Sequence, residues 1–165
     1  GDVLTHCFRP FPNSPATAQG TVKQAVRDAR ARGVLFDVGH GKGSFSWKTA
    51  RAMLANGFLP DTISSDVHQL CIDGPAYDQV TTLSKFLCMG VDLATVIKLS
   101  TETAGLALQR PELGTLKPGV PGDATILSLD EGEWVYEDVL GETMTGSQRL
   151  HARGVVLGGT WWHPA

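Results

Sequence analysis

The feature that most constrains the fold is an alternation of short apolar runs with helical patterns in the first part of the chain. Apolar, β-branched runs at residues 3–7, 34–38 and 62–65 indicate strands. Helical patterns lie between them, at residues 21–32 and 46–57. Strands that alternate with helices at this spacing are typical of a parallel α/β sheet or barrel. The sequence therefore predicts an α/β fold for this region.

The pattern changes towards the carboxyl end. Two more helices are expected, at residues 79–89 and 93–104, and Asp92 is placed to cap the second of them. After about residue 111, polar and apolar residues alternate between Gly and Pro turns, which favours antiparallel strands. We therefore expect two parts, an α/β part over residues 1–111 and a small β module over residues 112–165.

Composition argues against several classes of partner. A formal net charge of −3 offers no basic surface for nucleic acid or an anionic membrane. No apolar run approaches the roughly 20 residues of a membrane-spanning helix, and no signal peptide is visible. Three cysteines without a CxxC pair argue against a disulfide framework and against a thiolate zinc site. A reducing cytoplasm is therefore the expected location.

One polar residue follows each of the three expected strands: His6, His40 and Asp66. The carboxyl ends of parallel strands share one edge, where the loops of α/β proteins surround a common crevice. Two imidazoles and a carboxylate are suitable ligands for zinc or a similar ion, which lowers the pKa of its bound water to about 7. A hydrogen-bonded structural His and an Asp that caps a turn would give the same pattern, so spacing alone leaves both interpretations open.

The strings themselves carry a resemblance. GDVLTHCF, LFDVGHGKGSFS and LPDTISSDVH, in this order, resemble the later barrel strands of the amidohydrolase superfamily, and most of all its dihydroorotase-like and deacetylase branch. VTTLSKFLCMGVDLATVIKLSTETAGLAL resembles the two helices after the last strand of that family, and LGTLKPGVPGDATILSL resembles the return into its β-sandwich. The resemblance implies the carboxyl-terminal part of a (β/α)8 TIM-like barrel, followed by strands of a small β-sandwich domain.

The same resemblance implies a site. His6 would correspond to the metal-binding His of barrel strand 5, His40 to that of strand 6, and Asp66 to the Asp of strand 8. Asp66 would then be a metal ligand and also the general acid/base. The implied cofactor is zinc, as one or two divalent metal ions. His68 follows Asp66 closely and is expected to contact substrate or orient the metal ligands, although an exposed loop His fits the sequence equally well.

The implied activity is metal-dependent hydrolysis of an amide or ester bond in a small molecule, of the deacetylase or cyclic-amidase type. The His-x-His and the strand-4 Lys of the family do not occur in the chain, so we expect the amino-terminal half of the barrel to be a missing partner. The isolated chain is then expected to bind metal weakly and to lack activity. The alternative is a catalytically incomplete structural fragment, with open sheet edges that favour association with other copies.

Other features of the sequence have simpler interpretations. The string GHGKG lacks the spacing of a phosphate loop, which argues against a nucleotide-binding α/β domain. His151 and His163 are expected to be structural. Trp134, Trp161 and Trp162 are expected in the core of the β-sandwich or at its rim.

Overall fold

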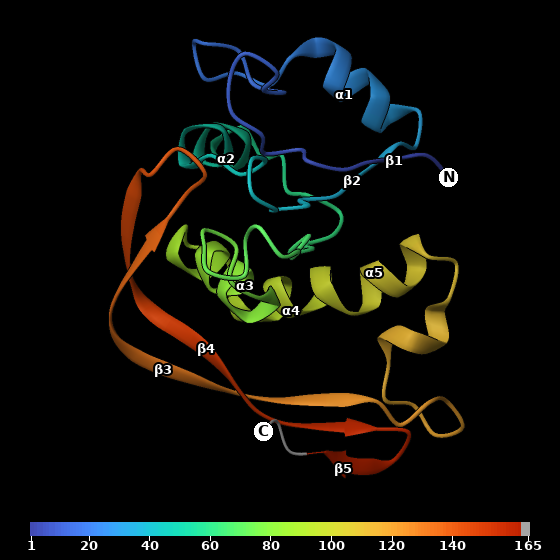
Figure 1. Cartoon of the computed structure of the whole chain (residues 1–165). Helices are drawn as coiled ribbons and strands as arrows, with labels where there is room; N and C mark the ends of the chain where they lie inside the picture. The colour runs from blue at the N-terminus through green and yellow to red at the C-terminus, as the bar shows by residue number, and fades with distance from the viewer. Residues whose placement is uncertain (163–165) are drawn as a thin grey trace.

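The structure is a computed structural model that describes residues 1–162 (Figure 1). The helices are α1 (Gln24–Ala31), α2 (Trp47–Ala55), α3 (Gln79–Cys88), α4 (Leu93–Ser100), α5 (Glu102–Ala107) and the short 3-10 helix η1 (Pro111–Gly114). The strands are β1 (Val3–Leu4), β2 (Leu35–Phe36), β3 (Ala124–Glu137), β4 (Thr143–Leu157) and β5 (Thr160–Trp162). None of the helices in this part of the chain is long and apolar enough to span a membrane.

Three extended segments lie side by side in the α/β part. β1 pairs with β2 in parallel, and a parallel bridge from Asp37 to Thr62 adds residues 62–65 as the third segment. Backbone bonds continue this pairing, because the His40 N–H donates to the Ser64 carbonyl oxygen at 3.1 Å and the Gly41 N–H to that of Ser65 at 2.9 Å. The predicted parallel α/β arrangement is confirmed, with regular pairing confined to short stretches.

The order of these segments corrects the strand numbers expected from the sequence. The family resemblance assigns His40 and Asp66 to barrel strands 6 and 8, which requires one strand between them. The segment that ends at His40 instead pairs directly with the segment that ends at Asp66. If Asp66 follows the last strand, then His40 follows strand 7 and His6 follows strand 6. The assignments of His40 to strand 6 and of Asp66 to strand 8 therefore cannot both hold.

Side-chain caps and hydroxyl groups set the ends of the central helices. Asp92 caps α4 as expected, because its Oδ1 accepts the Thr95 N–H at 2.9 Å. The single helix expected over residues 93–104 is interrupted at Thr101, whose backbone leaves the helical region. Its hydroxyl donates to the Ile97 carbonyl oxygen, and Thr103 donates to that of Lys98. Such side-chain bonds compete with the helix ladder, and the segment is divided into α4 and α5.

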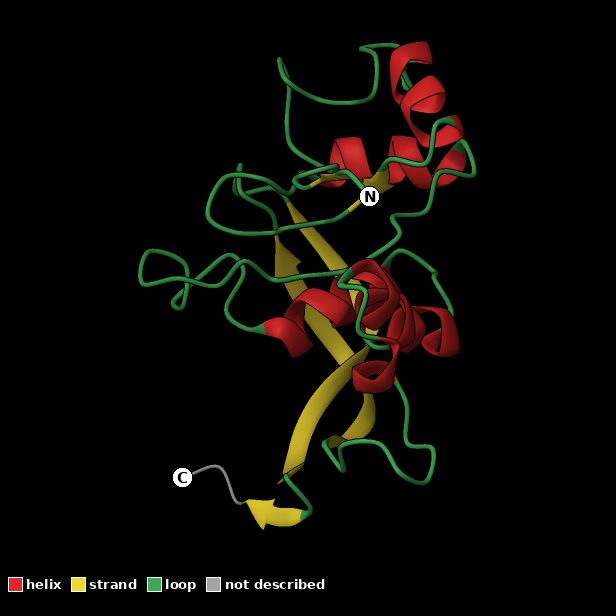
Figure 2. Cartoon of the chain, turned by 90° about the vertical axis from the view of Figure 1, so that its right-hand side faces the viewer, coloured by secondary structure: helices red, strands yellow, loops and turns green. Residues whose placement is uncertain are grey.

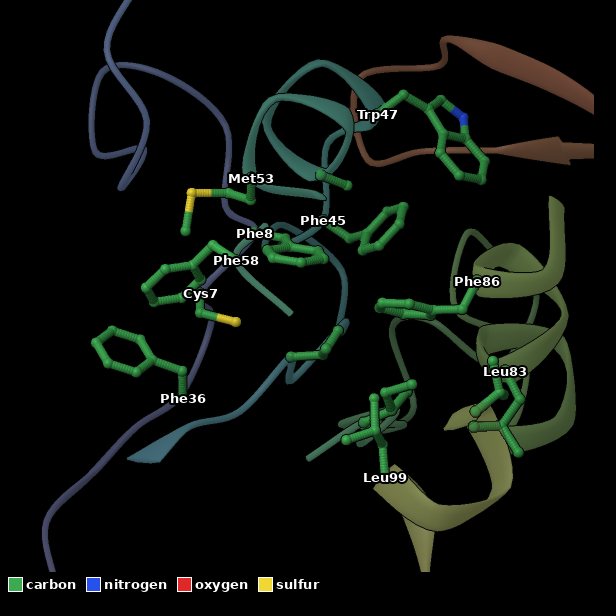
Figure 3. Packing of buried hydrophobic residues seen from close by; sticks show 14 of the residues in the cluster. Cys7, Phe8, Phe36, Phe45, Trp47, Met53, Phe58, Leu83, Phe86 and Leu99 are labelled. Carbon is green, nitrogen blue, oxygen red and sulfur yellow. The ribbon is translucent and has the colours of Figure 1, made fainter. Parts of the chain in front are cut away.

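An aromatic cluster joins the parallel segments to the helices (Figure 3). Phe8, Phe45 and Phe86 are fully buried, with ring centroids 5.8–6.3 Å apart, and Trp47 meets Phe45 edge-on at 5.1 Å. Phe8 follows β1, Phe45 precedes α2 and Phe86 lies on α3. Full burial of each ring is worth roughly 1.5–3 kcal/mol. The cluster therefore fixes α3 against the loops that follow the parallel strands.

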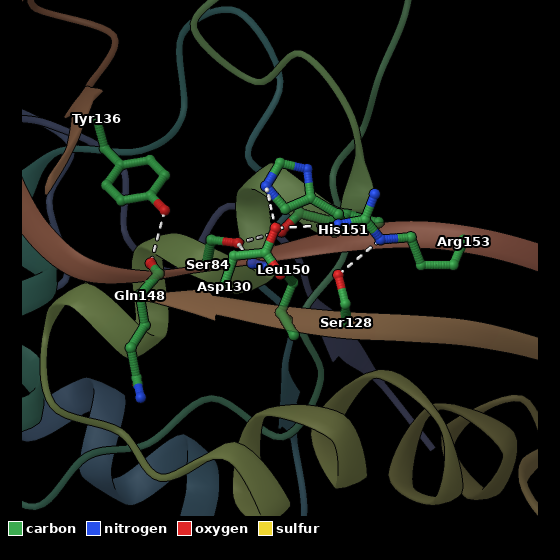
Figure 4. Close-up of polar contacts among 9 residues, drawn as sticks. Ser84, Ser128, Asp130, Tyr136, Gln148, Leu150, His151 and Arg153 are labelled. Atoms are coloured by element: carbon green, nitrogen blue, oxygen red, sulfur yellow. Dashed lines mark hydrogen bonds and ion pairs between the residues drawn. The ribbon is translucent and has the colours of Figure 1, made fainter. Parts of the chain in front are cut away.

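A long antiparallel hairpin, β3–β4, runs beside the helices, with β5 at its far end (Figures 1 and 2). The Ser84 hydroxyl of α3 accepts the Leu150 N–H of β4 at 3.0 Å (Figure 4). At the hairpin turn, Asp138 accepts the backbone N–H of Trp47 at 2.9 Å. The antiparallel pattern expected after residue 112 is thus present from Ala124 onward, and it is anchored to the α/β part.

The His and Trp side chains of this β module differ in their burial. His151 lies 3.5 Å from Asp130 and packs edge-on against Trp134, which fits the structural role expected for it. Trp134 is partly buried, whereas Trp161 and Trp162 are 48% and 58% exposed and do not form a core in this structure. His163 lies outside the described residues.

Candidate functional site

His6 lies just beyond β1, at a backbone kink. Its φ of 63° is uncommon for a residue other than glycine and turns the side chain out of the regular strand alternation. The ring Nδ1 lies 2.7 Å from the Gly39 carbonyl oxygen, which can only accept, so Nδ1 carries the proton. In the neutral tautomer with this proton, Nε2 presents a lone pair. A bond from Nδ1 to a backbone carbonyl is a common way to orient a metal-binding His.

Asp66 lies beyond the third extended segment and is also kinked, with a φ of 46°. Its side chain is exposed, and no donor among residues 1–162 forms a hydrogen bond with its carboxylate. The carboxylate is therefore free to bind a metal, a water molecule or a substrate.

Two glycines of the middle segment let these side chains approach its backbone closely. A Cβ at Gly39 would lie 2.7 Å from His6 Nδ1, and a Cβ at Gly41 would lie 2.6 Å from Asp66 Oδ2. Both glycines have left-handed φ values, +47° and +50°, so the segment is not extended there and the close approach is to the glycine backbone itself. Gly39 and Gly41 form what we call the glycine-lined face, against which His6 and Asp66 pack from the two neighbouring segments.

His40 lies between these glycines, and its ring enters the protein core. The imidazole is fully buried and stacks on Phe45 with centroids 4.7 Å apart and an interplanar angle of 9°. Nδ1 donates to the Gly41 carbonyl oxygen at 2.9 Å, so Nε2 is the acceptor nitrogen. Nε2 lies 2.7 Å from Nζ of Lys85. Burial and, second, the Lys85 charge lower the pKa of His40 to about 3.

Lys85 is a fully buried lysine on α3. Its Nζ donates to His40 Nε2 and to the carbonyl oxygens of Pro75 and Glu137, each at 2.7 Å. An ammonium group has three N–H donors, and all of them are used here. Burial lowers its pKa to about 8, and the nearby charges of Glu137 and Asp138 oppose that shift, so Lys85 stays protonated at neutral pH. The pair is a neutral imidazole that accepts from a charged lysine.

The three expected metal ligands are therefore not brought together. His6 and Asp66 share the glycine-lined face, whereas both ring nitrogens of His40 are engaged elsewhere. Over residues 1–162, no group of three or more His, Cys, Asp or Glu side chains is placed to hold a metal ion. An imidazole and a carboxylate are ligand types that a divalent ion takes, so the chemistry of His6 and Asp66 fits such an ion. His40 as placed does not fit.

His68 is exposed, within a turn that follows Asp66. Its backbone N–H donates to the thiol of Cys71, and its Nδ1 accepts the N–H of Leu70 at 3.2 Å. Nδ1 is therefore unprotonated and Nε2 carries the proton. His68 is thus placed as a hydrogen-bond donor at the surface beside Asp66.

Sequence reasoning missed Lys85 and Asp37. Each was visible as a charged residue among apolar or small neighbours, Lys85 beside Phe86 and Asp37 between Phe36 and Val38. A charge in such a position is buried only when it has partners. The partners come from distant parts of the chain, so the sequence did not reveal their roles.

The glycine-lined face gives a direct test. In the full-length protein, Gly41→Ala is expected to weaken zinc binding by roughly 10-fold or more, the range seen when the groups that orient metal ligands are lost. Its Cβ would collide with Asp66 Oδ2, and alanine is strained at a φ of +50°. Gly57→Ala is the matched control, because Gly57 also has positive φ but a Cβ there meets no atom within 4 Å. Isothermal titration of both variants measures the effect, and equal zinc affinities would contradict this placement of Asp66.

Comparison with known proteins finds relatives along nearly the whole chain. No family model matches the chain. The chain is 32% identical over 161 residues to a deacetylase of Enterococcus faecalis, across 96% of this chain and 44% of that protein. It is 30% identical over 158 residues to a deacetylase of Brucella anthropi, across 96% of this chain and 39% of that protein.

The fold of the chain is also similar to solved structures of enzymes. The crystal structure of an adenine deaminase superposes with a TM-score of 0.94 at 30% identity, over 99% of this chain and 45% of that one. A dihydroorotase superposes with a TM-score of 0.80 at 27% identity, over 97% of this chain and 42% of that one. The chain thus spans less than half the length of the proteins it matches, and along nearly its whole length it is similar to enzymes of the amidohydrolase superfamily.

Proposed function

We propose that the full-length protein containing this chain is a metal-dependent hydrolase that cleaves an amide or ester bond of a small molecule. The observation that carries the proposal is the packing of His6 against Gly39 and of Asp66 against Gly41, two glycines separated by one residue. The related deacetylases, adenine deaminase and dihydroorotase support an amidohydrolase-type reaction over a purely structural role.

We infer that β1, β2 and the segment 62–65 are the last three strands of a (β/α)8 barrel, and that β3, β4 and β5 belong to a β-sandwich. The TM-scores to two longer enzymes support this reading. Apolar side chains on the hairpin are strongly exposed, with Val135 at 65% and Leu157 at 61%. We propose that the rest of the same polypeptide covers them and supplies the remaining metal ligands.

The site residues have separate roles in the proposed reaction. A bound divalent ion, zinc in our proposal, would acidify a water molecule and polarise the scissile carbonyl. His6 would bind the ion through Nε2, the nitrogen left free by its bond to Gly39. Asp66 would bind through its free carboxylate, accept the proton of the water and return it to the leaving group. His68 would donate a hydrogen bond to the substrate from Nε2.

The substrate class that we propose first is an N-acetyl or O-acetyl compound, because both sequence relatives described above are named deacetylases. A cyclic amide is the second candidate, since one structural neighbour is a dihydroorotase. The buried free thiols of Cys7 and Cys71 agree with the cytoplasmic location that we propose.

The proposal is tested by measuring metal content and hydrolysis with the purified full-length protein. We expect bound zinc or a similar ion, turnover of simple acetylated or cyclic-amide substrates, loss of turnover with a chelator, and recovery when metal is added back. His6→Asn should remove both metal and turnover. His151→Asn is the matched control, because His151 lies in the β module, and it should retain both. Turnover that persists in metal-free His6→Asn would contradict the proposal.

A further inference from the structure

Asp37 places a carboxylate at the centre of the three parallel segments, two residues before Gly39. Its backbone N–H donates to the Leu4 carbonyl oxygen at 2.9 Å, and its own carbonyl oxygen accepts the Cys7 N–H at 3.0 Å. On the other side it forms the parallel bridge to Thr62. Asp37 is thus held by its backbone between the segments that precede His6 and Asp66.

The side chain of Asp37 repeats this connection with hydroxyl groups. Its Oδ2 accepts from Thr5 Oγ1 and from Ser64 Oγ, both at 2.7 Å, and its Oδ1 accepts from Thr62 Oγ1 at 2.6 Å. An ionised carboxylate only accepts, so all three hydroxyls must donate to it. One carboxylate therefore sets the rotation of three side chains on two flanking segments.

These hydroxyls lie directly beside the site. Thr5 immediately precedes His6, and Ser64 lies two residues before Asp66. Ser64 Oγ also accepts the N–H of Gly39, the residue whose carbonyl oxygen orients the His6 ring. Asp37 is thus linked to the Gly39 backbone, to which the His6 ring is hydrogen-bonded, and to the segment that ends at Asp66.

The Asp37 carboxylate does not form an ion pair with any of the described residues. Over residues 1–162, no Lys, Arg or His lies within ion-pair distance of its carboxylate, whereas Asp61 at the start of the third segment pairs with Arg30 at 2.9 Å. Hydrogen bonds to an ionised acceptor are shorter and stronger than neutral ones, and the three donor–acceptor distances to Asp37 are in that short range. Asp37 therefore acts through hydroxyl groups on the segments that carry the site.

We propose that Asp37 is a positioning residue that sets the separation and orientation of His6 and Asp66 for metal binding. The inference rests on the proposed function and adds to it a group that does not touch the ion. Partners that orient metal ligands commonly change metal affinity by about 10- to 100-fold when they are removed. The expected effect is thus on the affinity of the metal as well as on turnover.

The test uses the full-length protein and zinc titration calorimetry, with thermal unfolding measured in parallel. Asp37→Asn can no longer accept all three hydroxyls and should raise the zinc Kd by roughly 10-fold, and Asp37→Ala should raise it further. Excess zinc should recover part of the turnover of Asp37→Asn. Asp61→Asn is the matched control, because Asp61 bonds to Arg30 and to the Phe36 N–H, away from the site. It should lower the melting temperature and leave the zinc Kd within about 2-fold, since Asp61 does not contact the groups that orient the ligands.

Two less disruptive variants test the role of Asp37 if the Asp37→Ala protein does not fold. Thr5→Val and Ser64→Ala each remove one hydroxyl, and each should raise the zinc Kd by a few-fold. Zinc affinities in Asp37→Asn, Thr5→Val and Ser64→Ala that equal the wild-type value would overturn the inference, even if all three variants melt earlier. His6→Asn separates this result from failure of the proposed function. If His6→Asn loses zinc while the Asp37 variants keep it, only the positioning role fails, and if His6→Asn binds zinc like the wild type, the metal site itself is wrong.

Discussion

Replacement of Lys85 by alanine is expected to lower the free energy of unfolding by about 3–5 kcal/mol, because it removes a large buried side chain and leaves buried acceptors unpaired. The change leaves His40 Nε2 and the carbonyl oxygens of Pro75 and Glu137 without their shared donor, and it opens a cavity in the core. Urea unfolding of the full-length protein, followed by far-UV circular dichroism, measures the loss.

Two further variants identify the cause of the loss. Lys98→Ala is the control, because Lys98 lies exposed on α4 with only a surface ion pair, and its cost should stay within about 0.5 kcal/mol. Lys85→Met keeps much of the side-chain volume but none of the hydrogen-bond donors. The loss of these hydrogen bonds should still lower the free energy of unfolding by at least about 2 kcal/mol. A Lys85→Met protein as stable as the wild type would show that packing alone accounts for the buried lysine.

Acidification is expected to destabilise the protein through His40. The ordinary pKa of histidine is about 6.5, whereas burial and the Lys85 charge lower the pKa of folded His40 to about 3. Between these values the unfolded chain binds a proton that the folded protein excludes, so stability is present above pH 6.5 and is lost as the pH falls towards 3. The slope from this one group is about 1.4 kcal/mol per pH unit.

Carboxylates also titrate in this range, so the prediction concerns a difference between variants. His40→Gln does not titrate, and its free energy of unfolding should depend on pH less steeply than that of the wild type between pH 6.5 and 4. Equal slopes in the wild type and His40→Gln would contradict the neutral, buried state of His40.

The sequence alone determined the elements and their order. Strand and helix periodicities located the parallel segments and α1, α2 and α3, because burial of one face imposes a periodicity that is written in the chain. Asp92 was recognised as a cap because its bond to Thr95 is local. The same locality limited the interpretation of residues 93–104, where hydroxyl bonds around Thr101 divide the expected helix.

The tertiary structure decided which of the recognised residues meet. His6, His40 and Asp66 all follow parallel segments, but kinked backbones at His6 and Asp66 bring those two to the glycine-lined face, while His40 turns into the core. Spacing along a strand does not encode such a kink, which requires left-handed backbone angles that only the surrounding contacts stabilise. The sequence did not reveal the partners of Lys85 and Asp37 for a related reason: each partner is separated from its charged residue by tens of residues in the sequence. The types of residue available for chemistry were readable from the sequence, whereas the face each one occupies depended on long-range packing.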